Sequence, residues 1–139
     1  MSTICKVTPE SSLLQRRLVE DFAKSFKNEM NYDFIQFESD ETRDKSWFVN
    51  YEAFLFLAEY NPDKINCFGG CCFRWRDFKD SKSKWSLDWI WLEPDYRRQG
   101  HLQKAWSTFN MLYGDFHIAK PLSNDMEKFL DKKLTNLQK

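Results

Sequence analysis

The chain has 139 residues, which suits one compact domain, and we expect residues 1–139 to form a single domain. Its 21 basic and 21 acidic residues leave no net charge, which disfavours a general nucleic-acid binder, because such proteins usually carry a basic excess. No apolar run approaches the roughly 20 residues of a membrane span, and residues 1–12 lack the apolar segment of a signal peptide. We therefore expect a cytoplasmic protein without membrane contact.

Residues 13–30 have the pattern of an amphipathic helix. The segment "TPESS" before them offers capping hydroxyls and acidic residues, which are typical of a helix start. Apolar side chains then recur at helical spacing, at Leu14, Leu18, Phe22 and Phe26. The mixed segment that follows, up to residue 50, predicts either a short helix or an irregular stretch.

Two strands are predicted in the middle of the chain. Residues 51–60, "YEAFLFLAEY", are short, apolar and aromatic, and "NPDK" after them is typical of a turn. Residues 65–78, "INCFGGCCFRWRDF", also have strand composition. The pair Gly69-Gly70 predicts a bulge or a close approach of another backbone.

The four cysteines, Cys5, Cys67, Cys71 and Cys72, do not form a metal-binding pattern. "CFGGCC" has no matching second pair at zinc spacing, so we expect no metal site. We interpret the thiols as reduced, with adjacent Cys71 and Cys72 on opposite faces of a strand.

The C-terminal half predicts a strand, a helix, a short strand and a last helix. Residues 85–92, "WSLDWIWL", are apolar on both faces and indicate a central strand, with Asp88 in phase with Ile90 and Leu92 and opposite the tryptophans. Residues 101–113 have helical spacing and Gly114 ends that helix. Residues 115–119 predict the short strand, and residues 123–138 the last helix, capped by Ser123. The order indicates an α/β (α+β) domain with a mostly antiparallel sheet flanked by helices.

The turn "EPDYRRQG" joins the central strand to a helix and has the composition of an anion site. A helix N-terminus exposes unpaired N–H groups, and Gly100 allows a phosphate to approach them closely. Arg97 and Arg98 add positive charge at the same corner. A pyrophosphate cradle is therefore one interpretation, and an exposed turn with solvated arginines is the other.

This stretch, "LEPDYRRQGHL", resembles motif A of the GNAT-type N-acetyltransferases. Leu92, Pro94, Tyr96, Arg97 and Gly100 match the family signature, whereas Leu102 stands where the family usually has glycine or alanine. Residues 116–133 are similar to the P-x-S-x-x-M-x-x-F-L pattern of the family's cohesin-acetyltransferase branch. The resemblance implies a GNAT-like fold, but the chain ends at Lys139 before the hairpin that usually follows the last helix, so we expect a domain without that hairpin.

The resemblance further implies acetyl-CoA (coenzyme A) as cofactor. It places the pantetheine arm along Ile90, Trp91 and Leu92, and the pyrophosphate near the turn and the following helix. The implied cofactor-binding residues are Ile90, Trp91, Leu92, Arg97, Arg98, Gln99, Gly100, His101, Leu102, Gln103, Ser123 and Asn124.

Asp88 is the candidate general base for such a transferase. A carboxylate on an apolar central strand is desolvated, which raises its pKa toward the value that proton removal near neutrality needs. The alternative is a structural Asp88 held by hydrogen bonds. Glu93 is a second candidate base, and the helix 123–138 lacks the tyrosine that serves as acid in the family.

Three other patterns have ordinary explanations beside functional ones. His101 and His117 fit a helix surface and a local hydrogen bond on a short strand. "FRWRDF" alternates aromatic and basic residues, which fits a half-buried strand or a stacking face for nucleic acid.

The resemblance leaves two main functions open. The first is an N-acetyltransferase that passes an acetyl group from acetyl-CoA to a primary amine by direct attack in a ternary complex. The alternative is a non-catalytic GNAT-like module that binds acyl-CoA or a partner. Without the hairpin the acceptor site is open, which suits a protein or another macromolecule, and the incomplete sheet edge and many aromatics make a homodimer a candidate assembly.

Overall fold

A computed structural model describes residues 3–32, 37, 51–58, 66–76, 83–119 and 124–137. In the last helix, side chains are described only for residues 126–132. The elements follow the order β1 (Thr3–Val7), α1 (Leu13–Met30), β2 (Tyr51–Leu57), β3 (Cys67–Arg76), β4 (Lys84–Leu92), the short 3-10 helix η2 (Pro94–Tyr96), α2 (His101–Tyr113), β5 (His117–Ile118) and α3 (Asn124–Leu137).

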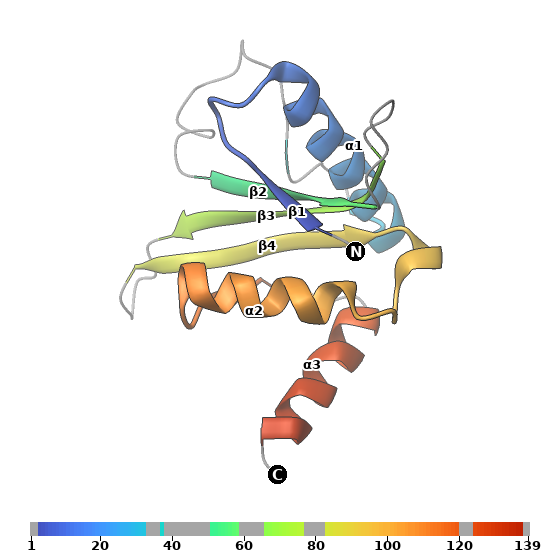
Figure 1. The fold of residues 1–139 in the computed structure, drawn as a ribbon, viewed down its shortest axis with the longest axis vertical. Helices are drawn as coiled ribbons and strands as arrows, with labels where there is room; N and C mark the ends of the chain where they lie inside the picture. Colours follow the sequence, from blue (N-terminus) through green and yellow to red (C-terminus); the bar gives the residue numbers. More distant parts are fainter. Residues whose placement is uncertain are drawn as a thin grey trace.

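The strands form one five-stranded sheet in the order β1-β2-β3-β4-β5. The first four strands pair antiparallel, and β5 pairs parallel to β4, a geometry that needs a crossover connection, here α2. Helix α1 covers one face of the sheet, α2 covers the other, and α3 lies below α2 (Figure 1). The predicted α+β class and mostly antiparallel sheet are therefore confirmed.

The predicted elements are present, with ends that differ by a few residues, and one strand was missed. Ser12 caps α1 by accepting a hydrogen bond from the Gln15 N–H, as the predicted helix start requires. The sequence pattern assigned no structure before Thr8, yet residues 3–7 form the edge strand β1, paired with β2. The capping residue expected for α3, Ser123, lies outside the described residues.

The two faces of the sheet bury separate apolar clusters. One cluster packs under α2 and contains Cys71, and the other packs under α1 and contains Cys72. All four cysteines are free thiols, and the adjacent pair faces opposite sides of β3 as expected. Burial raises the pKa of the Cys72 thiol to about 12, which fits an unreactive core residue rather than a nucleophile.

Gly69 allows β3 and β4 to approach each other more closely than any other residue would. A Cβ atom at this position would lie 2.4 Å from Leu92 Cδ2 and 2.6 Å from the Trp91 carbonyl oxygen. The register between β2 and β3 also shifts here, between Phe56 and Leu57. Both parts of the prediction for the glycine pair, a bulge and a close backbone approach, are confirmed.

We expect Gly69→Ala to lower the free energy of unfolding by about 2 kcal/mol, because the methyl group meets main chain that cannot rotate away. Urea unfolding of the purified variant measures the effect. Gly70→Ala is the matched control, since its Cβ would lie 3.2 Å from the side chain of Phe22, which can shift. Equal stability of the two variants would contradict the close approach of β3 and β4 at Gly69.

A β-bulge at Asp88 corrects the predicted faces of β4. Cys72 pairs with Trp89 while Phe73 pairs with Leu87, so Asp88 has no partner of its own on β3. Trp89 and Trp91 contact the α1 cluster, whereas Trp85 and Ile90 contact the α2 cluster. The expectation that Asp88 is in phase with Ile90 is therefore wrong, as is the expectation of one shared tryptophan face. An extra residue reverses the alternation of a strand without leaving a local sequence signal.

Candidate functional site

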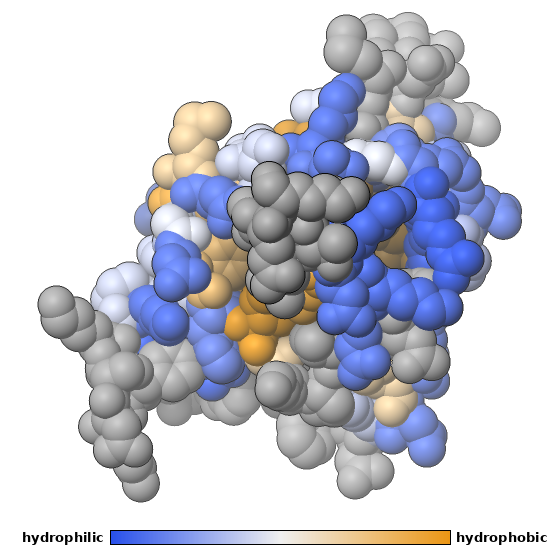
Figure 2. Space-filling view, turned by 90° about the horizontal axis from the view of Figure 1, so that it is seen from below, coloured by the Kyte–Doolittle hydropathy of each residue, from blue (hydrophilic) through white to orange (hydrophobic). Residues whose placement is uncertain are grey.

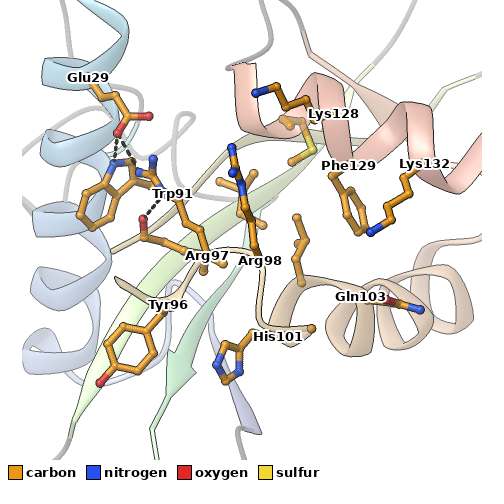
Figure 3. Close-up of a pocket in the computed structure, with 15 residues that line it drawn as sticks. Glu29, Trp91, Tyr96, Arg97, Arg98, His101, Gln103, Lys128, Phe129 and Lys132 are labelled. Atoms are coloured by element: carbon orange, nitrogen blue, oxygen red, sulfur yellow. Dashed lines mark hydrogen bonds and ion pairs between the residues drawn. The ribbon is translucent and has the colours of Figure 1, made fainter. Parts of the chain in front are cut away.

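A pocket of about 360 Å³ lies where β4 ends, between the following turn, the start of α2 and the side of α3. Figure 3 shows side chains converging on it from α1, β4, the turn, α2 and α3. Its volume falls within the range of small-molecule sites. Its lining residues are Glu29, Ile90, Trp91, Leu92, Tyr96, Arg97, Arg98, Gly100, His101, Leu102, Gln103, Met126, Lys128, Phe129 and Lys132.

The start of α2 presents unpaired main-chain donors to this pocket. Gly100 is the N-cap residue in a left-handed conformation, with φ of 85°, and no side chain caps the helix. The first intrahelical bond runs from the Lys104 N–H to the Gly100 carbonyl, so the N–H groups of residues 101–103 have no partner within the helix. A Cβ atom on Gly100 would meet nothing within 4 Å, so the space beside the start of the helix is open. This arrangement is typical of an anion site.

The edge of β4 above the bulge contributes main-chain groups. Its parallel ladder with β5 includes only Ser86 and Leu87, so the two strands separate after the bulge. The Glu93 N–H donates to the Phe68 carbonyl on β3, and because alternate residues of a strand bond to opposite sides, Ile90 and Leu92 direct their main-chain groups away from β3. Among the described strands, none pairs with this edge. An extended ligand with amide groups therefore has a complementary edge here.

Arg97 joins the turn to α1 rather than standing free in the pocket. Its Nη2 lies 2.7 Å from Glu29 Oε1 on α1, and its Nε donates to the Leu92 carbonyl at 2.8 Å. Its guanidinium also lies over the Trp91 ring, 5.6 Å from the centroid, and Trp91 Nε1 donates to the same Glu29 oxygen (Figure 3). Arg97 thus fixes the turn on α1. It also forms a hydrogen bond with the Leu92 carbonyl, so that of the two outward-facing residues of β4, Ile90 keeps its carbonyl available.

Most of the other predicted cofactor-binding residues line the pocket. Arg98, like Gly100, has a positive φ, 64°, and its side chain rises beside the pocket toward α3 (Figure 3). Leu102 is half-buried against the α2 cluster and lines the pocket at the open helix start. Gln99 is directed elsewhere, since its amide donates to the Asp95 carbonyl. Ser123 lies outside the described residues, and of Asn124 only its place as the first residue of α3 is described.

His101 lines the pocket as a neutral group. Its imidazole packs against the ring of Phe68, at 4.6 Å, and lies 6.0 Å from the ring of Tyr96, which stacks directly on Phe68. Burial, followed by the nearby Lys104 ammonium, lowers the pKa of His101 below its usual value. At pH 7 the ring therefore adds no positive charge to the site.

Asp88 lies apart from the pocket, in a buried ionic cluster on the α1 face of the sheet. Arg76 binds its carboxylate with two hydrogen bonds, of 3.0 and 2.8 Å, and Arg74 Nε lies 3.2 Å from Oδ2. The Ser86 hydroxyl donates to Oδ1 at 3.0 Å, and only 2% of the Asp88 side chain is exposed. Because two guanidinium groups and a hydroxyl already engage both carboxylate oxygens, and because the group lies outside the pocket, the geometry favours the structural alternative for Asp88.

Glu29, Lys128, Phe129 and Lys132 are pocket residues that the sequence pattern did not identify. Glu29 is separated from Trp91 by 62 positions in the chain, and no local pattern connects them. The lysines on α3 have a weak signal, a spacing of one helical turn, which also fits a solvated helix face.

Within the described part of the chain, no group of three or more His, Cys, Asp or Glu side chains is placed to hold a metal ion. No helix in that part is long and apolar enough to cross a membrane.

The fold is similar to that of solved acetyltransferase structures. No family model and no curated protein matches the sequence. An aminoglycoside acetyltransferase from an uncultured soil metagenomic sample matches 96% of this chain and 86% of its own, with a TM-score of 0.60 and 14% identity. The ribosomal-protein-alanine N-acetyltransferase of Brucella melitensis biovar Abortus matches 96% and 89%, with a TM-score of 0.59 and 13% identity.

The xEco2 acetyltransferase domain, solved as a complex with a CoA conjugate, matches 89% of this chain and 82% of its own, with a TM-score of 0.59 and 10% identity. These similarities establish the fold: the chain has the architecture of the GNAT-type N-acetyltransferases, as the motif resemblance implied.

Proposed function

We propose that this protein is an acetyl-CoA-dependent N-acetyltransferase that acts on a primary amine. The observation that carries the proposal is the uncapped start of α2, which opens into the pocket beside the free edge of β4. The GNAT-like fold supports it, since similar structures are acetyltransferases and one of them is bound to a CoA conjugate.

The residues of the pocket suit coenzyme A in charge and in hydrogen-bonding groups. The N–H groups of His101, Leu102 and Gln103 suit a pyrophosphate, because a helix N-terminus combines unpaired donors with the positive end of the dipole. Arg98 adds a cation beside them. The main-chain groups of Ile90 suit the amides of a pantetheine arm. When bound, acetyl-CoA supplies an acetyl group already activated as a thioester.

The chain's own contribution to the reaction is positioning. The edge of β4 and the start of α2 hold the acyl donor at two points, which fixes its direction and reduces the entropy lost when an amine attacks. Main-chain N–H groups of the diverging β4 edge are the candidates for stabilising negative charge on the acyl oxygen. The amine must also lose a proton, and a water-mediated transfer fits a pocket in which the carboxylate among the described lining residues, Glu29, is engaged by Arg97.

Among the described residues of the pocket, no carboxylate is free of an ion pair, and this favours a second candidate function. In this second function the protein binds acyl-CoA but does not transfer the acyl group. The two functions differ in one measurable product, since only turnover releases the free thiol of coenzyme A.

Calorimetric titration with acetyl-CoA tests the shared premise, and we expect a dissociation constant in the micromolar range. Thiol release is then followed with a lysine-containing peptide, a peptide with a free N-terminal alanine and an aminoglycoside as acceptors. Binding with amine-dependent thiol release supports the transferase, and binding without release from any acceptor supports the second candidate. No binding at millimolar acetyl-CoA contradicts both.

A further inference from the structure

The wall of the pocket that α3 contributes carries two lysines. Lys128 and Lys132 are exposed, are one helical turn apart and flank Phe129, whose ring contacts Trp106 at 5.1 Å. In Figure 3 Lys132 points toward α2, and Lys128 points to the side on which Arg98 rises. This cationic pair is separate in the chain from the motif at residues 92–102.

The charges of α3 are divided between its faces. Its described acids, Glu127 and Asp131, are exposed and do not line the pocket, whereas both described lysines do. Two like charges at this spacing repel each other and destabilise a helix slightly, unless an anion lies between them. Among the described carboxylates, none forms an ion pair with either lysine. Seen from the side of α2 and α3, a small hydrophobic area lies among largely hydrophilic residues (Figure 2).

The pocket therefore contains more positive charge than one pyrophosphate accounts for. Its described lining has four cationic side chains, Arg97, Arg98, Lys128 and Lys132, against one carboxylate, Glu29, which is bound to Arg97. The pyrophosphate is already matched by the donors of α2 and by Arg98, on one wall. The lysines of the opposite wall suit a second, separate anionic group of the same ligand.

We infer that Lys128 and Lys132 bind the 3′-phosphate of coenzyme A and make the site selective for coenzyme A over acyl carriers that lack this group. The inference rests on the proposed function, and it assigns the specificity to α3 instead of the motif. The 3′-phosphate is the one anionic group of coenzyme A besides the pyrophosphate, and it carries about two negative charges at neutral pH. Two ammonium groups one turn apart match that charge.

The test compares coenzyme A with dephospho-coenzyme A, which has the same pyrophosphate and pantetheine arm but no 3′-phosphate. Calorimetry on the full chain gives the ratio of the two dissociation constants for the unmodified protein and for the double variant Lys128→Gln/Lys132→Gln. We expect coenzyme A to bind roughly tenfold more tightly than dephospho-coenzyme A, and the ratio to fall to about one in the double variant. Lys24→Gln on α1, an exposed lysine that does not line the pocket, is the matched control and keeps the ratio unchanged.

The ratio separates this inference from the proposed function. Equal affinity of the unmodified protein for both ligands overturns the role of the lysines and leaves the coenzyme A site standing. If the double variant keeps the same ratio of dissociation constants as the unmodified protein, the role of the lysines is overturned as well. If neither ligand binds at millimolar concentration, the proposed function fails and the inference fails with it. Misfolding of the double variant would weaken the binding of both ligands alike. A loss of affinity for coenzyme A alone therefore cannot be explained by misfolding.

Discussion

Gly100→Glu is expected to weaken acetyl-CoA binding by about 100-fold or more. A side chain on Gly100, the N-cap residue that lines the pocket, enters open space beside the unpaired N–H groups of α2. A carboxylate there competes for the same donors and repels a pyrophosphate, and like charges in contact cost several kcal/mol, of which about 2.7 kcal/mol already corresponds to 100-fold. Calorimetric titration with acetyl-CoA measures the loss.

The opposite end of the same helix offers the matched control. Gly114 ends α2 with φ of 64°, a Cβ atom there would also meet nothing within 4 Å, and the residue does not line the pocket. Gly114→Glu therefore also places a side chain at a positive φ, where strain costs about 1–3 kcal/mol, but without a charge in the pocket, and we expect it to bind acetyl-CoA normally.

Gly100→Ala completes the series, because it has the strain of a left-handed residue without the carboxylate. We expect it to retain most of the affinity, since its methyl group meets open space. Normal binding by Gly100→Glu would show that the start of α2 does not hold the pyrophosphate. An equal loss in all three variants would attribute the effect to strain.

Half of this pocket was predictable from the sequence because it is built from neighbouring residues. The end of β4, the turn and the start of α2 follow one another within residues 90–103, and glycine at a strand-to-helix junction leaves a local signal. The same holds for α1, where Ser12 and the apolar spacing defined the helix and its start. Capping residues, turn glycines and apolar spacing decide such features locally, and tertiary packing is compatible with them.

The other half depends on contacts that no local pattern encodes. Glu29 reaches Arg97 across 68 positions because α1 packs on the sheet, and the lysines of α3 face the pocket because of where that helix docks. Arg97 shows the consequence for function: its residue type predicted a phosphate ligand, but its neighbours in space engage it as a support of the turn. The five residues of β1 were missed because their pattern is too short to decide between strand and loop.

Asp88→Asn is expected to lower the free energy of unfolding by about 3 kcal/mol. The substitution keeps the shape of the side chain but removes the charge that two guanidinium groups share, one of them, Arg74, only 13% exposed. Breaking a buried ion pair from one side leaves the remaining charges poorly compensated. Urea unfolding measures the loss, and Asp21→Asn on the exposed side of α1 is the control, expected to change stability by less than about 0.5 kcal/mol.

A double-mutant cycle with Arg76→Gln determines whether the loss comes from the cluster. Residues in direct contact couple by about 0.5–3 kcal/mol, so the double variant should be more stable than the sum of the two single losses implies. Unchanged stability of Asp88→Asn together with loss of turnover would instead restore Asp88 as a general base.

The cluster also explains how a residue outside the pocket controls its lining. The bulge at Asp88 places Ile90 and Leu92 on the α2 side of β4, and a shift by one residue would turn both away from the pocket. The ion pairs with Arg74 and Arg76 on β3 hold the bulge at one position in the register. We therefore expect Asp88→Asn to weaken acetyl-CoA binding along with stability, whereas loss of a base would leave binding intact. Calorimetry on the folded variant at low temperature separates the two roles.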